Sequence, residues 1–274
     1  MTDKYKREGK TSLFLHYTTC SIHILLYEVV EVGKKLKIFI ISRKQKIYIS
    51  IITILSGIAL SLWGAGCLYK ADEVMAVPLG NKVILLDPGH GGIDAGASDN
   101  GAVEKELNLE IANILKGYIE ENGGVCYMTR VDDTNTADPN RGKGVSQKMS
   151  DLKMRKKNID DYKADIFISI HMNRFSQSQY KGLQVFYDDN IDESKLLGES
   201  IQNSVRGILK DGNTRKAKAT GDKIYVLKGN EIPSVLVECG FLSNKEEAKN
   251  LKNPDYQRMI AWGIFCGISQ YFTH

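Results

Sequence analysis

Residues 85–97 read LLDPGHGGIDAGA and join a short apolar run to a loop in which one histidine lies among glycines. Glycine loses more backbone freedom on folding than any other residue, so clustered glycines indicate positive φ angles or a close approach of other groups. The apolar run is typical of a buried strand. The segment is therefore interpreted as a strand that ends either in a simple turn or in a site around His90.

Beyond this segment, apolar strand patterns alternate with helical patterns. Short apolar runs that suit strands buried on both faces occur at 82–86, 125–129, 165–170, 183–187 and 234–238. Apolar residues recur every four positions in 104–122 and again in 255–272, which predicts two amphipathic helices. The order predicts a single α/β domain whose mainly parallel or mixed sheet is covered by helices on both faces.

An uncharged run of 23 residues, 47–69, precedes this domain. A helix of that length spans about 30 Å of hydrocarbon, so the sequence predicts one N-terminal transmembrane helix. Basic residues gather before the run, which by the positive-inside rule places residues 1–46 in the cytoplasm and the domain outside. The alternatives are a buried core helix, a signal peptide cleaved after Ala76 and a lipoprotein processing site at Cys67.

The chain is thus expected to have four parts, namely a cytoplasmic segment 1–46, an anchor 47–69, a linker 70–81 and a globular domain 82–274. Residues 1–80 contain 11 Lys and Arg against 6 Asp and Glu, whereas residues 81–274 contain 26 against 27. Because the globular domain is almost neutral, the sequence predicts no nucleic-acid partner. The five cysteines show no spacing typical of a disulfide framework or a cysteine zinc site.

Three of the strand patterns end in residues that can bind metals or move protons. Asp87 and His90 follow the first strand, His171 follows the third, and Glu238 ends the last. Ligands of open parallel sheets bind beyond the carboxyl ends of the strands, so these side chains are expected to converge. Glu104 begins the first long helix, and on spacing alone it is interpreted as a carboxylate favoured by the helix dipole.

Five motifs occur in order along the domain: LLDPGHGGIDAGA, EKELNLEIA, the pair Thr129 and Arg130, FISIHMN and LVECGFLSN. Together they resemble the zinc-dependent N-acetylmuramoyl-L-alanine amidases of the Amidase_3 family. The resemblance runs from about residue 82 to residue 272. It implies the family's α/β fold, a Zn²⁺ cofactor and a substrate in peptidoglycan.

The resemblance also implies roles for four residues. His90, Glu104 and His171 would be the zinc ligands, which replaces the helix-start interpretation of Glu104. Two histidines and one carboxylate leave a fourth coordination position of the zinc ion for water. Binding to zinc lowers the pKa of that water to about 7. Glu238 would act as the general base on that water and then as the general acid for the leaving amine.

Other residues have supporting roles in this hypothesis. Arg155 and Asn173 are expected to contact the substrate, with Arg155 orienting its carboxylates. Asn173 and Asp87 are also expected to support the histidines from outside the ligand set. The family often has asparagine where this chain has Asp160, whose role stays open. The polar stretch 131–150 is expected to be a loop that contacts a partner, the substrate or neither.

The implied reaction is hydrolysis of the amide between N-acetylmuramic acid and L-alanine. TRKAK at 214–218 and the following IYVLK resemble the sporulation-associated, CwlD-type members, which act in the spore cortex towards muramic-δ-lactam. The expected enzyme is held in the membrane by 47–69, faces the cortex space and binds peptidoglycan; a regulatory protein partner stays open. The alternatives are a non-catalytic peptidoglycan-binding module and another metal-dependent wall hydrolase, a peptidase or a deacetylase.

Overall fold

The computed structural model describes residues 30–32, 35–37, 42–69 and 79–273. The chain divides into two compact units, Met1–Glu73 and Val74–His274. Most of the expected cytoplasmic segment 1–46 and of the linker 70–81 lies outside the described residues.

The first unit contains a short hairpin and one long helix. Strand β1 (Val30–Val32) pairs antiparallel with β2 (Lys35–Lys37), and helix α1 covers Arg43–Tyr69. The uncharged run 47–69 is therefore helical, as expected, and apolar side chains such as Ile52 and Leu60 are exposed along it. Within the described part of the chain, no helix combines the length and the apolar character needed to cross a membrane, so the transmembrane prediction is not confirmed.

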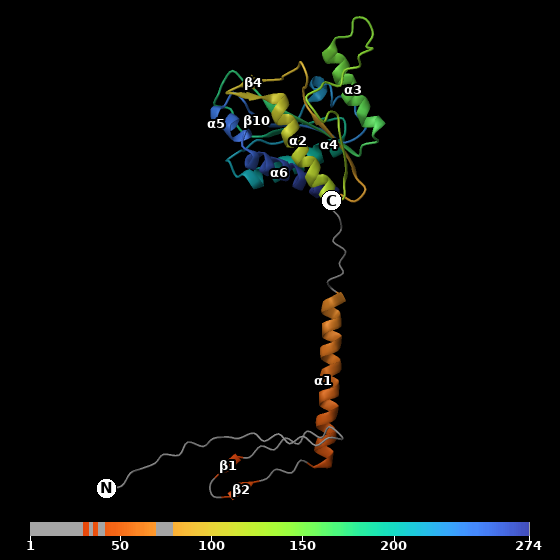
Figure 1. The fold of residues 1–274 in the computed structure, drawn as a ribbon, viewed down its shortest axis with the longest axis vertical. Helices are drawn as coiled ribbons and strands as arrows, with labels where there is room; N and C mark the ends of the chain where they lie inside the picture. The colour runs from red at the N-terminus through yellow and green to blue at the C-terminus, as the bar shows by residue number, and fades with distance from the viewer. Residues whose placement is uncertain (1–29, 33–34, 38–41, 70–78, 274) are drawn as a thin grey trace, which may run out of the picture. The chain divides into compact units, whose positions relative to one another are not determined.

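The second unit is built on a six-stranded sheet with the strand order β6-β3-β7-β10-β8-β9 (Figure 1). Its strands are β3 (Val83–Pro88), β6 (Val125–Met128), β7 (Ile166–Asn173), β8 (Gln184–Tyr187), β9 (Lys218–Ala219) and β10 (Ser234–Phe241). The strands β6, β3, β7 and β10 are parallel, whereas β8 is antiparallel to β10 and β9 is parallel to β8. The sheet is therefore mixed, and all five predicted strands are confirmed.

The helices of this unit are α2 (Glu104–Glu121), α3 (Gln147–Asp161), α4 (Asp192–Leu209), α5 (Lys245–Leu251) and α6 (Pro254–Thr273), with a 3-10 turn at Gly221–Lys223. The two predicted helices correspond to α2 and α6. Helix α3 begins inside the stretch 131–150 that was expected to be a loop, with Ser146 capping it by accepting a hydrogen bond from the Met149 amide. A short hairpin of β4 (Ser98–Asp99) and β5 (Ala102–Val103) precedes α2.

One face of the sheet is covered by α2, α4 and α6, which lie together in Figure 1. Alternate residues of β7, namely Ile168, Ile170 and Met172, belong to the large apolar core on this face. Helices α4 and α6 approach closely, because a Cβ atom on Gly267 of α6 would lie only 2.5 Å from the Cα atom of Ile201 in α4. A side chain larger than glycine at this position would therefore overlap the backbone of α4.

The other face carries a smaller apolar core, in which Leu85 and Phe167 of the sheet pack with Ile159 of α3. Helices therefore cover both faces, as predicted. Because side chains alternate along a strand, His171 and Asn173 of β7 point to the face with the smaller core. The parallel strands β3, β7 and β10 end at the same edge, so the loop and strand residues of the expected site come together there.

Candidate metal and catalytic site

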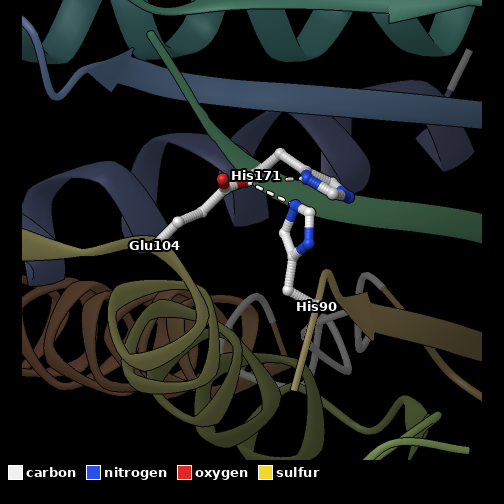
Figure 2. Close-up of side chains that lie close together, drawn as sticks. All are labelled: His90, Glu104 and His171. Atoms are coloured by element: carbon white, nitrogen blue, oxygen red, sulfur yellow. Dashed lines mark hydrogen bonds and ion pairs between the residues drawn. The ribbon is translucent and has the colours of Figure 1, made fainter. Parts of the chain in front are cut away.

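The side chains of His90, Glu104 and His171 point toward one another at the carboxyl edge of the sheet (Figure 2). His90 lies in the loop after β3, Glu104 is the first residue of α2, and His171 lies on β7. The Oε1 atom of Glu104 lies 3.2 Å from His90 Nε2 and 2.9 Å from His171 Nδ1. One ligand atom from each residue lies within 4.8 Å of the other two, so the cluster could hold a metal ion.

The glycines around His90 leave space for this cluster. A Cβ atom on Gly89 would lie 2.2 Å from the imidazole of His171, and one on Gly96 would lie 2.5 Å from Glu104 Oε2. The glycine loop is therefore more than a turn, because larger residues at these two positions would overlap the side chains of the site.

Replacement of Gly89 tests this steric argument. Gly89→Ala is expected to displace the His171 ring and to lower zinc affinity, since the added methyl group would overlap the ring. The matched control is Gly117→Ala in α2, where a Cβ atom meets nothing within 4 Å and where alanine favours the helix by about 1 kcal/mol. Competition with a coloured chelator measures zinc affinity in both variants. Wild-type affinity in Gly89→Ala would contradict the argument.

Glu104 is buried and held in one orientation by backbone groups. Its Oε2 accepts a hydrogen bond from the Ala97 amide at 2.7 Å, and its Oε1 accepts one from the Met172 amide at 3.1 Å. Burial opposes ionisation, but hydrogen bonds and charge from His171 and His90 hold the pKa of Glu104 below its usual range. The carboxylate is therefore ionised and oriented, which suits an anionic metal ligand.

Asp94 holds the other side of the His90 ring. Its Oδ2 lies 3.0 Å from His90 Nδ1, whereas Nε2 of the same ring is directed at Glu104. Burial disfavours the charged imidazole, but Glu104 and Asp94 together raise the pKa of His90. Carboxylates placed in this way orient histidines that bind metals. Asp94 was not among the predicted residues, and its position four residues after His90 is the signal that could have found it.

Glu238 lies beside the cluster on β10. It pairs in register with His171 on β7, so the two side chains point to the same face of the sheet. Its Oε2 atom is buried and has no hydrogen-bond partner among the described residues. Burial raises the pKa of Glu238 to about 7, with Glu104 adding to the rise and His171 opposing it. A carboxylate with a free oxygen and this pKa is suited to exchanging a proton.

Arg155 differs from its expected role as a substrate ligand. Its side chain is 2% exposed. The guanidinium donates to Asp87 Oδ1 at 2.6 Å, Asp151 Oδ2 at 2.7 Å and the backbone oxygens of Pro88 and His90 at 2.8 Å and 2.7 Å. Because these partners surround it, Arg155 fixes the backbone that carries His90 and faces protein rather than substrate.

Asp87 lies outside the ligand set and is the charged partner of Arg155. It is buried and accepts hydrogen bonds from Arg155, from the Thr129 hydroxyl at 2.7 Å and from the Ser169 hydroxyl at 2.7 Å. Burial would raise the pKa of Asp87, but the Arg155 charge and these hydroxyls lower it below its usual range. Asp87 thus acts on the His90 backbone through Arg155, and it is close enough to His171 for the two charges to interact, so its expected support of the histidines from outside the ligand set is indirect.

Loss of Arg155 is expected to be costly. Arg155→Met leaves the buried Asp87 carboxylate without its partner and should destabilise the domain by about 3–5 kcal/mol in urea unfolding. Arg258→Met is the control, because it removes an exposed ion pair with Asp255 and should cost less than about 1 kcal/mol. Equal stability of the two variants would contradict the structural role of Arg155.

The Asp87–Arg155 pair also implies a pH dependence of stability. Since the folded-state pKa of Asp87 is lowered, the pair stabilises the wild type above the unfolded pKa near 3.9 and loses this effect as the pH falls through the folded value. In Arg155→Met the unpartnered buried carboxyl favours protonation. The difference in unfolding free energy between wild type and variant is therefore expected to shrink between pH 7 and pH 4.

Arg130 and Asn108 hold the same loop, a role that their positions in the sequence do not indicate. Arg130 donates from Nε to the Pro88 oxygen at 2.9 Å and from Nη2 to the Gly89 oxygen at 3.1 Å. Asn108 donates to the same Gly89 oxygen at 3.0 Å. With Arg155, these side chains fix the backbone just before and at His90. The sequence contains the motif with Arg130, but it does not indicate which backbone oxygens Arg130 binds.

Asn173 and Asp160, the remaining two residues singled out by the sequence, lie at the end of β7 and on α3. Asn173 ends β7 two residues after His171, on the same face of the sheet, and is partly exposed. Its contact with substrate stays a prediction. Asp160 is exposed on α3, and nothing in the structure gives it a role.

The donor set fits a zinc ion. Catalytic zinc sites commonly use three protein ligands drawn from histidine nitrogens and carboxylate oxygens. Here the two imidazoles are each 19% exposed, so a substrate can reach the cluster, while Glu104 is buried behind them. The unpaired oxygen of Glu238 lies next to this donor set. Such an arrangement can support hydrolysis, in which a cation activates water and a carboxylate moves the proton.

Comparison with known proteins identifies the class to which this fold and site belong. Residues 84–270 match the family Amidase_3, N-acetylmuramoyl-L-alanine amidase. The chain belongs to this family and is an N-acetylmuramoyl-L-alanine amidase acting on peptidoglycan. The resemblance seen in the sequence motifs is thereby confirmed, and the alternative of a non-catalytic module is not supported.

Individual relatives place the chain more narrowly. It is 41% identical over 199 residues to the germination-specific N-acetylmuramoyl-L-alanine amidase of Bacillus subtilis, covering 72% of this chain and 83% of that protein. It is 32% identical to the amidase LytC of the same organism, covering 74% of this chain but 38% of LytC. Its fold is similar to that of the CwlD amidase from Clostridioides difficile, which was solved in complex with the GerS lipoprotein. The TM-score is 0.67 and the sequence identity 43%, and the match covers 70% of this chain and 99% of the CwlD chain.

Proposed function

We propose that this amidase is zinc-dependent and cleaves the bond between N-acetylmuramic acid and L-alanine in spore cortex, as a step towards muramic-δ-lactam. The observation that carries the proposal is the cluster of His90, Glu104 and His171 with the buried carboxylate of Glu238 beside it. The similar Bacillus subtilis protein is named germination-specific, which supports the cortex as the substrate.

The residues of the site have distinct tasks in this reaction. A zinc ion held by His90, Glu104 and His171 would supply polarisation of the amide carbonyl and a lowered pKa of water. Glu238 accepts a proton from the attacking water, whose oxygen forms a bond to the carbonyl carbon. The carbon–nitrogen bond then breaks, and Glu238 returns the proton to the alanine nitrogen. The products are a free carboxyl group on muramic acid and a peptide that begins with alanine.

Product analysis tests this proposal. Purified cortex and vegetative peptidoglycan are digested by the full chain with zinc added, with zinc chelated and with zinc restored. Mass spectrometry is expected to find muramic acid without peptide and peptides with N-terminal alanine, only when zinc is present. Retention of alanine on muramic acid would indicate a peptidase, and loss of acetyl groups would indicate a deacetylase. Full activity after chelation would contradict the role of zinc.

We also propose that residues 47–69 anchor the enzyme, with the catalytic domain outside the cytoplasmic membrane. The uncharged run, the basic residues before it and the exposed apolar side chains of α1 support this location. Protease added to intact protoplasts should digest the catalytic domain and leave an epitope tag at residue 1 protected. Protection of the domain would contradict the proposal.

A regulatory protein partner is a further part of the proposal. The CwlD amidase from Clostridioides difficile was solved in complex with a lipoprotein, and this chain is 43% identical to it. We therefore expect the purified chain to cleave cortex peptidoglycan faster when a lipoprotein of that kind from the same organism is added. Equal initial rates with and without the lipoprotein would contradict this expectation.

A further inference from the structure

We propose that Arg215 binds a carboxylate of the substrate's peptide beside the metal cluster. The proposal rests on the proposed amidase function and gives Arg215 the task of orienting substrate carboxylates, which the sequence predicts for Arg155. Four features of the structure support it: the position of Arg215 along the sheet edge, its fixed orientation, the absence of an ion pair to it among the described residues and the hollow next to it.

The position of Arg215 follows from the pairing of three strands. Gln184, Glu238 and His171 occupy paired positions on β8, β10 and β7. Paired residues of adjacent strands point to the same face, and adjacent strands are about 4.8 Å apart, so Gln184 lies about 10 Å from His171 across the sheet. Arg215 Nη1 donates a hydrogen bond to Gln184 Oε1 at 2.9 Å. Its guanidinium is therefore bonded to the same edge of the sheet that carries the metal cluster.

The guanidinium of Arg215 is held in one orientation. Its carbon lies 4.8 Å from the centre of the buried Phe241 ring, and its Nε donates to the Lys181 backbone oxygen at 3.0 Å. Gln184 is itself fixed, because its Nε2 donates to the Lys216 backbone oxygen at 2.7 Å. A guanidinium that is stacked and hydrogen-bonded in this way loses little freedom when it binds a ligand.

Arg215 forms no ion pair in the described part of the chain, and the one carboxylate known to feel its charge, that of the buried Glu247, accepts its hydrogen bonds from the amides of Gly182 and Phe241. Arg155, Arg174 and Arg258 each form an ion pair with an aspartate, whereas no carboxylate lies within 4.0 Å of the Arg215 guanidinium among the described residues. Its Nη2 also has no acceptor among those residues. Because Arg215 is only partly exposed, its unused donors are suited to a carboxylate supplied by a ligand.

A hollow of about 330 Å³ adjoins this guanidinium, and its lining carries the two cations Arg215 and Lys181 and one carboxylate, Asp211, so its side chains have a net positive charge. The carboxylate that Arg215 would bind belongs to the peptide rather than to the glycan. The carboxyl group of muramic acid forms the amide that is cleaved, and the rest of the glycan is neutral. An extended peptide advances at most about 3.6 Å per residue, so a carboxylate two or three residues beyond the cleaved bond would reach the guanidinium. The inferred ligand is therefore an acidic peptide segment.

The test uses two synthetic muramoyl tripeptides that differ only in whether the second and third residues carry free carboxylates or carboxamides. The wild type should cleave the carboxylate form with a kcat/KM that is about 10- to 100-fold higher than its kcat/KM for the carboxamide form. Arg215→Gln should remove this preference by raising KM for the carboxylate form, with kcat and zinc content unchanged. Arg215→Lys keeps the charge but not the planar fork, and should retain part of the preference.

Arg258→Gln on α6 is the matched control and should behave as the wild type. A wild type without preference, or an Arg215→Gln variant that loses the same factor on both substrates, would overturn the proposal. If the wild type cleaves neither substrate, the proposed zinc amidase mechanism fails, but Arg215 is still tested by calorimetry with the free acidic tripeptide. That peptide should bind Arg215→Gln at least tenfold more weakly, and equal affinity would overturn the proposal.

Discussion

Glu238→Gln is expected to lower kcat by about 10²- to 10⁴-fold while the protein keeps its zinc. The substitution replaces a carboxylate by an amide of the same size, which cannot accept the proton of the attacking water. Glu238 pairs with His171 across the sheet, yet its buried Oε2 has no partner among the described residues. Because Glu238 is not among the three residues whose ligand atoms gather, we expect its carboxylate to act on the substrate and not to be needed to hold the metal.

Metal analysis and single-turnover rates with excess enzyme check this expectation. Gln184→Ala is a useful comparison. Gln184 is the residue of β8 that pairs with Glu238, as His171 is on the opposite neighbouring strand β7, but its side chain does not titrate. This variant should affect KM more than kcat. Parallel loss of zinc and turnover in Glu238→Gln would mean that Glu238 is a ligand, and the assigned roles would then be wrong.

His171→Ala is expected to weaken zinc binding itself, and by more than any substitution outside the ligand set. His171 lies 2.9 Å from Glu104 and is one of the three residues in the cluster. Asp94→Asn should cost only about 10- to 100-fold in zinc affinity, because Asp94 contacts His90 rather than the metal position. The two variants thus separate a ligand from a residue that orients a ligand.

Zinc dissociation constants from chelator competition measure this series, and far-UV circular dichroism checks that each variant is folded. Asp99→Asn serves as a control, since Asp99 pairs with the exposed Arg174 and has no contact with the cluster. A His171→Ala variant that binds zinc as tightly as Asp94→Asn would show that His171 is not a ligand.

Most of the sheet could be predicted from the sequence because its strands are continuous apolar runs. Strands β3, β7 and β10 are buried on both faces over most of their length, and each contains a run of apolar residues, although Ser169, His171 and Asn173 alternate with apolar residues in the second half of β7. Strand β9 and the β4–β5 hairpin were missed, since each strand has two residues and carries no pattern. Helix α3 was partly missed because its mean hydropathy is low and its first turn lies in a polar stretch.

The site was predictable only in part. Glu104 looks like an ordinary helix-start carboxylate from its spacing, and only the family resemblance assigned it to the metal. Arg155 was expected to meet substrate, but its partner Asp87 is 68 positions away in the sequence, so nothing local indicates that the guanidinium turns inward. Arg215 was noticed only as part of a motif. Its partners lie on other elements and are invisible from spacing.

The sequence by itself determined the classes of the elements and which residue types follow the ends of the strands, since apolar periodicity and glycine content are local properties. The tertiary structure decided which of these residues meet. The pairing of β3, β7 and β10 sets the distances between segments far apart in the chain, and the alternation of side chains sets the face on which each one points. For that reason His171 and Glu238 share a face, whereas Arg155 is buried against Asp87 and Arg215 keeps a donor that no described residue accepts from.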